Sequence, residues 1–296
     1  MRNSRLWKTM KPKLKEAWNS YRLLKRNTLT RIALYLVFAL VLIAIFAPVV
    51  LPSVQEINEQ ADAAFTLQAP SSQHLFGTDE LGRDIFLRTL IGTRVSLGTA
   101  VICVAISVVV GVILGATAGY FGGVVDDIIM RITDMFLSFP SLLLAMAVAA
   151  ILGPSLQNAI IAIVISWWPS YTRIVRGQAV SVKERQFVKA AKAIGTPNFK
   201  IITSHVIPNC LAPVIVQVSM DLGNVIMTLA SLSFLGLGAQ APTPEWGLMV
   251  STSRNYFLNA WWYSIFPGLA IFVTVLAFNL VGDGLREILD PKTKKK

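Results

Sequence analysis

The sequence predicts an all-α polytopic membrane protein with six transmembrane helices, and three observations support this fold class. Hydrophobic residues make up 54% of the 296 residues and charged residues only 15%, whereas about a quarter of the residues are charged in soluble proteins. The apolar residues form blocks of about 20, the helix length that crosses a hydrocarbon core about 30 Å thick. The basic residues lie between these blocks, where they set orientation. The net charge of +11 therefore predicts a lipid bilayer as partner and no nucleic acid.

Six apolar blocks are the expected spans, and they divide the chain into an arm, a loop, a core and a tail. The spans are 32–51, 95–120, 135–152, 158–171, 211–237 and 261–281. The arm is 1–31, the first span is followed by an extracytoplasmic loop 52–94, the core is 95–285 and the tail is 286–296. The fourth span is short and contains Pro169, so five spans remain an alternative.

The distribution of basic residues predicts that both termini are cytoplasmic. Of the 27 Lys and Arg residues, 23 lie in the segments that six spans place on one side, and 4 lie in the two loops on the other. Lys and Arg are retained on the cytoplasmic side of a membrane. Those basic segments are 1–31, 121–134, 172–210 and 282–296.

The basic arm 1–31 is not expected to be a cleaved signal, because the apolar block that follows it exceeds a signal sequence's apolar region of about 7 to 15 residues. Leu6, Met10, Leu14 and Trp18 recur at near-helical spacing among basic residues. This pattern is typical of an interfacial helix on anionic lipid. A solvated basic tail is the alternative.

Three glycines in the second span indicate a packing face. Gly111, Gly115 and Gly119 recur every four residues and so share one face of a helix, where missing side chains let another helix approach closely. Chance glycines in a membrane helix are the alternative.

Asp221 lies inside the fifth expected span, where an ionised carboxylate is costly. We expect its side chain to face a water-filled cavity or to contact a polar partner. One reading places it on a substrate path, together with Asn224, where it meets a cationic group. In the other reading it makes a structural hydrogen bond to Asn224 or to a neighbouring helix.

The polar and basic segment 173–209 is a long loop for a compact bundle, and such loops are usually functional. Helix-compatible stretches on either side of Gly195 and Pro197 predict two short helices along the membrane surface. Such helices can dock into a groove of a soluble partner, with the small Ala190 and Ala191 permitting close approach. An ordinary connector is the alternative.

Motifs of catalysis are missing from the sequence. There is no G-x-x-x-x-G-K-[ST] phosphate loop, and no metal or redox spacing involves Cys103 or Cys210. His74 and His205 fall on opposite sides of the membrane in this topology. We therefore expect a protein that is not an enzyme and binds no cofactor.

The loop 173–209 carries a family signature. Lys189-Ala190-Ala191, then Gly195, then Ile207-Pro208 resembles the E-A-A…G…I-x-L-P signature of permease subunits of ATP-binding-cassette importers. Lys189 stands where that signature has glutamate. The resemblance implies that these residues couple the chain to an ATPase: the first four form the coupling helix and its turn, and the last two begin the re-entry into the membrane.

Three further motifs resemble the second permease of the dipeptide, oligopeptide and nickel importers. They are His74 to Asp79 with Gly82-Arg83-Asp84, Ala241 to Gly247, and Asn279 to Arg286 with Asp290-Pro291. The resemblance implies a type I importer permease fold in the bacterial or archaeal plasma membrane. It also implies a similar second permease, two cytoplasmic ATPases that bind ATP and Mg, and an extracytoplasmic binding protein as partners.

The outer motif has two readings. Its six residues are Gly77, Thr78, Asp79, Gly82, Arg83 and Asp84. Asp79, Arg83 and Asp84 could cap and pair a short surface helix, or the motif could dock the binding protein.

We expect a transport subunit that receives force from ATPases and forms half of a translocation path for di- or oligopeptides. Nickel, metal chelates and glutathione remain alternative cargoes. Two rivals come from other classes: a secondary transporter with Asp221 as its coupling carboxylate, and a membrane scaffold that transports nothing.

Overall fold

The computed structural model describes residues 28–59 and 61–289, and within them all regular secondary structure is helical. The all-α class is therefore confirmed. The arm's first 27 residues, with the interfacial helix expected there, lie outside the described residues, as do residues 290–296 of the tail.

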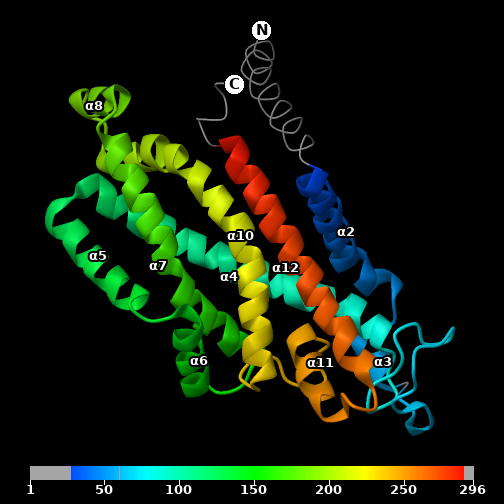
Figure 1. Cartoon of the computed structure of the whole chain (residues 1–296). Coiled ribbons are helices and arrows are strands. Elements are labelled where there is room, and N and C mark those ends of the chain that lie inside the picture. Colours follow the sequence, from blue (N-terminus) through cyan, green and yellow to red (C-terminus); the bar gives the residue numbers. More distant parts are fainter. Residues whose placement is uncertain (1–27, 60, 290–296) are drawn as a thin grey trace.

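Five long helices build the molecule, and shorter ones join them (Figure 1). The long helices are α2 Thr28–Val50, α4 Ile85–Phe121, α7 Leu156–Lys183, α10 Ile207–Phe234 and α12 Trp261–Leu289. The shorter α-helices are α3 Val54–Glu59, α5 Gly123–Leu137, α6 Ser141–Leu152, α8 Gln186–Ala193, α9 Asn198–Ile201 and α11 Trp246–Ser253. The turns Ala63–Phe65 and Arg254–Tyr256 are 3₁₀-helical, and Ile202–Val206 is a π-helical turn.

Among the described residues, four helices are long and apolar enough to cross a membrane: α2, α4, the run Asn198–Phe234 that ends with α10, and α12. The pair α5 and α6 makes a fifth if it counts as one bent span. The C-terminal half of α7 carries Arg173 and Arg176, which lowers its hydropathy. The number of six spans therefore stays a prediction.

The expected third span, 135–152, is not one helix. Helices α5 and α6 are bent by 87° with respect to each other, and the break falls at Ser138 to Pro140. Proline lacks the N–H that continues a helix and disfavours helical backbone in the residue before it. Because α5 begins at Gly123, most of the expected cytoplasmic loop 121–134 is helical as well.

The expected extracytoplasmic loop is shorter than 52–94, because α4 begins at Ile85. Asp84 caps this helix: its Oδ1 accepts a hydrogen bond from the backbone N–H of Leu87 at 3.0 Å. Such a cap satisfies one of the unpaired N–H groups at a helix start. The next turns carry Arg88 and Thr89, which are buried against the rest of the protein.

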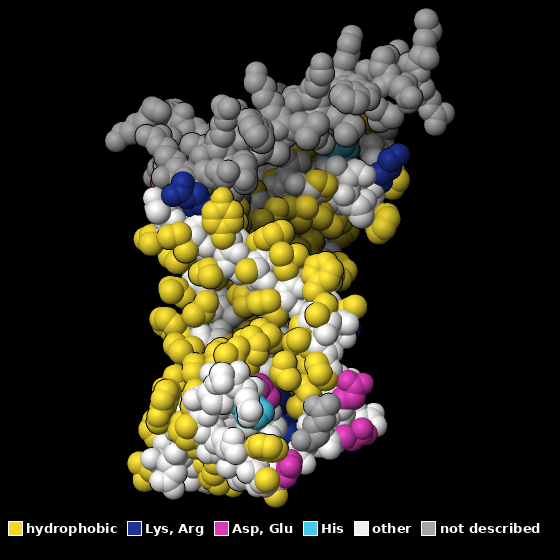
Figure 2. Space-filling model, turned by 90° about the vertical axis from the view of Figure 1, so that its right-hand side faces the viewer, with side chains coloured by type: hydrophobic (Ala, Val, Ile, Leu, Met, Phe, Trp, Pro, Cys, Tyr) yellow, Lys and Arg dark blue, Asp and Glu magenta, His cyan; other side chains and the backbone are white. Residues whose placement is uncertain are grey.

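Helix α4 crosses behind α7, α10 and α12, and α2 packs against α12 and α4 (Figure 1). Helix α8 lies at the same end as the start of α2 and the end of α12, whereas α3 and α11 lie at the opposite end (Figure 1). Hydrophobic side chains cover the middle of the face drawn in Figure 2, between these ends. This face therefore suits contact with lipid.

The three glycines of α4 lie directly against α7. A Cβ added at Gly115 would be 2.5 Å from the carbonyl oxygen of Thr172, and one at Gly119 would be 2.6 Å from the Cβ of Ala179. A Cβ at Gly111 would overlap the Cβ of Tyr171. Absent side chains therefore let these two helices touch through their backbones.

We expect Gly115→Ala to destabilise the protein by about 1–3 kcal/mol, the usual effect of overpacking. The added methyl group has no room, because both the Thr172 carbonyl and the Val175 side chain are in the way. Thermal unfolding of the purified protein in detergent measures the change. Gly98→Ala is the matched control on the same helix, since nothing lies within 4 Å of its added Cβ. Equal melting temperatures of the two variants would contradict the assignment of a packing face.

Candidate functional site

The coupling segment, residues 184–206, links α7 to α10 and contains α8 and α9. It is shorter than the expected loop 173–209, because α7 continues to Lys183 and α10 begins at Ile207. Both expected short helices are present: α8 corresponds to the first, and α9 with the π-helical turn corresponds to the second. This second part runs directly into α10 instead of ending before it.

Gly195 makes the turn between α8 and α9. Its φ of +79° is left-handed, a conformation that glycine adopts at no steric cost and that commonly ends helices. Its N–H donates to the carbonyl of Lys192 at 3.1 Å, and the N–H of Thr196 donates to that of Ala191 at 3.1 Å. The last carbonyl groups of α8 are thus satisfied, and the chain reverses there.

The outer side of the coupling segment is apolar and exposed. Ile194 is 83% exposed and Phe199 is 79% exposed. Ala190 is exposed too, whereas Val188 and Ala191 are buried against the body of the protein. Exposed apolar groups mark an interaction site, and Ala190 adds an exposed position without a bulky side chain.

Lys189, which replaces the glutamate of the family signature, makes an ion pair within the chain. Its Nζ lies 2.9 Å from Oε2 of Glu184, and both side chains are exposed. The hydrogen bond from Lys189 lowers the pKa of the Glu184 carboxyl below its usual value. An acidic and a basic side chain are thus paired at the start of α8. Ile207 and Pro208 form the first turn of α10, where proline is well tolerated.

The candidate path residue Asp221 lies near the middle of α10 and is only 4% exposed. Its Oδ1 accepts a hydrogen bond from Nε2 of Gln217, one turn earlier, at 3.0 Å. Its Oδ2 makes no hydrogen bond with any described residue. The expected partners are close as well: donor groups of Asn224 on the same helix and of Tyr171 and Trp167 on α7 lie near the carboxylate.

Asp221 and Asn224 line the same cavity, which has a volume of about 420 Å³. Helices α6, α7 and α10 form its wall, and each of them contributes polar side chains. The polar residues that line it are Ser141, Ser166, Ser170, Asp221, Asn224, Thr228 and Ser231. A second hollow of about 310 Å³ shares Met227 and Ser231 with the first and continues along α10 to Phe234 and Leu235. The two hollows follow one stripe of this helix.

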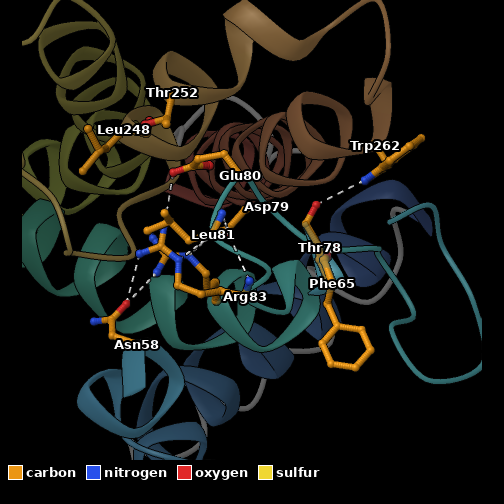
Figure 3. A network of polar contacts seen from close by, with 11 residues as sticks. Asn58, Phe65, Thr78, Asp79, Glu80, Leu81, Arg83, Leu248, Thr252 and Trp262 are labelled. Carbon is orange, nitrogen blue, oxygen red and sulfur yellow. Dashed lines mark hydrogen bonds and ion pairs between the residues drawn. The ribbon is translucent and has the colours of Figure 1, made fainter. Parts of the chain in front are cut away.

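Three residues of the outer motif, Thr78, Asp79 and Arg83, belong to a network of polar contacts (Figure 3). The Asp79 side chain is fully buried and accepts hydrogen bonds from the N–H groups of Leu81 and Arg83, each at 2.9 Å, and from Nε of Arg83 at 2.7 Å. Arg83 also donates to Oδ1 of Asn58 on α3 at 3.0 Å. The network therefore joins the loop to α3.

The other motif residues fix the loop to α4 and α12. The carbonyl of Thr78 accepts from the indole of Trp262 on α12 at 3.4 Å, and Asp84 both caps α4 and contacts Nδ1 of His74 at 2.9 Å. Gly77 and Gly82 have positive φ values of 73° and 78°. Because Thr78, Asp79 and Arg83 are buried, their geometry favours the structural reading, although the helix they serve is the long α4 and not a short surface helix.

Two buried charged residues were not singled out from the sequence. Arg88 lies with Nε 3.5 Å from Oδ2 of Asp79. Glu245 is 1% exposed, and its carboxylate accepts from the N–H groups of Gly247 and Leu248 at 3.0 and 2.9 Å. An acidic residue just before a helix is a usual capping signal, so the position of Glu245 could have been predicted.

Comparisons with known proteins agree with this geometry. The family model described as "Binding-protein-dependent transport system inner membrane component" matches residues 111–295, and "N-terminal TM domain of oligopeptide transport permease C" matches residues 14–70. The chain is 48% identical to the dipeptide transport system permease protein DppC of Alkalihalophilus pseudofirmus, over 93% of this chain and 90% of that protein. It is 45% identical to the probable D,D-dipeptide transport system permease protein DdpC of Escherichia coli K12, over 93% and 91%.

A glutathione transport system permease protein, GsiD of Escherichia coli O157:H7, is 43% identical over 94% of this chain and 90% of that protein. Among solved structures, a chain of the inward-facing MetNI methionine ABC transporter has a TM-score of 0.52 and 17% identity, over 65% of this chain and 92% of that chain. This last similarity shows the fold alone.

Proposed function

Because the chain belongs to the family of binding-protein-dependent transport system inner membrane components, we propose that it forms half of the translocation path of an importer for di- or oligopeptides. Its all-α fold is that of the type I importer permeases. It is a transport subunit, and separate partner subunits bind ATP and Mg and hydrolyse the ATP. The dipeptide permeases among its relatives support the choice of cargo.

The observation that carries this proposal is the coupling segment. Its exposed apolar side chains and the small Ala190 stand outside the helical body, where a groove of another protein can receive them. Two cytoplasmic ATPases are the proposed partners at this surface. A similar second permease completes the path, and an extracytoplasmic binding protein delivers the cargo at the opposite end.

The charges support an orientation with α8 in the cytoplasm. Basic side chains appear near the upper end of Figure 2, which is the α8 end in Figure 1, and acidic side chains near the lower end. Such an asymmetry follows the retention of Lys and Arg in the cytoplasm. We propose that both termini of this inner membrane component are cytoplasmic.

Co-purification and uptake test the proposed function. We expect the chain, expressed with its neighbouring transport genes, to purify with a second permease and two ATPases. In proteoliposomes with the binding protein, this assembly should import labelled alanyl-alanine only when ATP is present at the α8 side. Unlabelled glutathione and nickel are the competitors that distinguish the alternative cargoes. Transport by the lone chain, or no uptake of any peptide, would contradict the proposal.

A further inference from the structure

We propose that Asp221 binds the ammonium group of the cargo during translocation, so that the path selects peptides with a free amino terminus. This inference rests on the proposed function and adds a specificity-determining residue to it.

The cavity lies along the run Asn198–Phe234, which is long and apolar enough to cross a membrane. Asp221 follows Ile207, the first residue of α10, by 14 residues, which is about 21 Å along a helix axis. The hydrocarbon core of a bilayer is about 30 Å thick. The cavity of about 420 Å³ is within the size range of small-molecule sites, which is roughly 300–1,000 Å³.

The carboxylate of Asp221 has neutral neighbours only. Gln217 donates to its Oδ1, and donor groups of Tyr171, Trp167 and Asn224 lie close to it. No basic side chain among the described residues lines the cavity. Because a buried charge without a charged partner is costly, a cation that enters the cavity is a favourable partner for Asp221.

The wall suits an organic ammonium group better than a metal ion. Asp221 is the only carboxylate among the residues that line the cavity, and no basic side chain lines it. The described residues contain no group of three or more His, Cys, Asp or Glu that could hold a metal ion. Hydroxyl groups of Ser166, Ser170 and Thr228 accept hydrogen bonds, which satisfies the remaining protons of an ammonium group.

The adjoining hollow has room for the part of the peptide beyond its amino group. Met227 and Ser231 line both hollows, and the second one is mainly apolar, with Phe234 and Val250 in its wall. Met227 follows Asp221 on α10 at about 9 Å along the helix axis. A short peptide held at its amino terminus by Asp221 can therefore place an apolar side chain against Met227.

Photo-crosslinking of the intact four-subunit assembly, without the binding protein, tests this inference. The probes are alanyl-benzoylphenylalanine and its N-acetyl derivative, and the readout is the mass-spectrometric yield of adduct on the α10 peptide that contains Met227. We expect the free-amine probe to give about tenfold more adduct, as a charged hydrogen bond is worth this factor or more. Asp221→Asn should abolish the difference and Asp221→Glu should retain it.

Asp127→Asn is the matched control, because it removes an exposed carboxylate from α5, outside the cavity. Equal labelling of the unaltered assembly by both probes, or an unchanged preference in Asp221→Asn, would overturn the inference. So would the absence of any adduct. If the same assembly still imports alanyl-alanine, the proposed function survives this failure; if it imports no peptide, the proposed function fails as well.

Discussion

Replacing Ala190 by tryptophan is expected to abolish peptide uptake and to separate ATP hydrolysis from transport, while the protein stays folded in the membrane. Ala190 is exposed on α8, so the larger side chain meets nothing within the chain itself. In a fitted groove of the ATPase, however, overpacking costs about 1–3 kcal/mol or more, which is about a tenfold loss of docking or greater. Uptake and stimulated ATPase activity in proteoliposomes measure the effect.

The controls for this prediction use the same segment. Ala190→Ser keeps a small side chain and should transport normally. Ala191→Trp should also abolish uptake, but for a different reason, because Ala191 is buried and the substitution displaces α8 itself. Gly195→Pro should do likewise, since proline cannot adopt the positive φ of this turn. Normal uptake by Ala190→Trp at normal abundance would show that α8 is an ordinary connector.

Removing the charge of Arg83 is expected to destabilise the protein by about 3–5 kcal/mol, the usual cost of removing one partner of a buried ion pair, although Arg88 remains 3.5 Å from Asp79. In Arg83→Met, Asp79 keeps two backbone N–H groups but loses the hydrogen bond from Nε. Asn58 on α3 loses the shorter of its two hydrogen bonds from arginine and keeps the one from Arg88 at 3.5 Å. The thermal unfolding temperature of the purified protein, followed by size-exclusion chromatography after heating, measures the change.

Arg94→Met is the matched control, because it removes an arginine that is exposed on the same end of α4. It should leave the unfolding temperature nearly unchanged. The double variant Asp79→Asn with Arg83→Met should not recover the loss, because the buried Arg88 then loses the carboxylate of Asp79. If Arg83→Met unfolds like the unaltered protein but loses stimulation by the binding protein, the outer motif is a docking site and not a structural cluster.

Features that depend on local spacing were predictable from the sequence. Four-residue spacing places Gly111, Gly115 and Gly119 on one helix face, and that face contacts α7. Gly195 and Pro197 break the helical pattern, and the chain turns there. A carboxylate within an apolar block has few stable surroundings, and Asp221 lies at a polar cavity.

Features that depend on distant contacts were not predictable in this way. By composition, Arg88 and Thr89 belong to the expected loop. In the structure, the carbonyl of Thr89 accepts a hydrogen bond at 2.9 Å from the indole of Trp246, which lies 157 residues away in the sequence. Such contacts bury polar residues inside α4 and shift its start from residue 95 to Ile85. The extent of the bend between α5 and α6 is likewise set by packing, although Pro140 marks its place.

Site-directed cross-linking at Ala190 tests most directly whether the coupling segment receives force from an ATPase. The native Cys103 and Cys210 are buried, so a cysteine introduced by Ala190→Cys is the accessible thiol among the described residues. In intact membranes of the full assembly, we expect it to form a cross-link to an ATPase subunit that changes in yield when ATP binds. Ala64→Cys, at the opposite end of the molecule, should form none. A cross-link of Ala190→Cys to the extracytoplasmic binding protein, or to no subunit at all, would contradict the account.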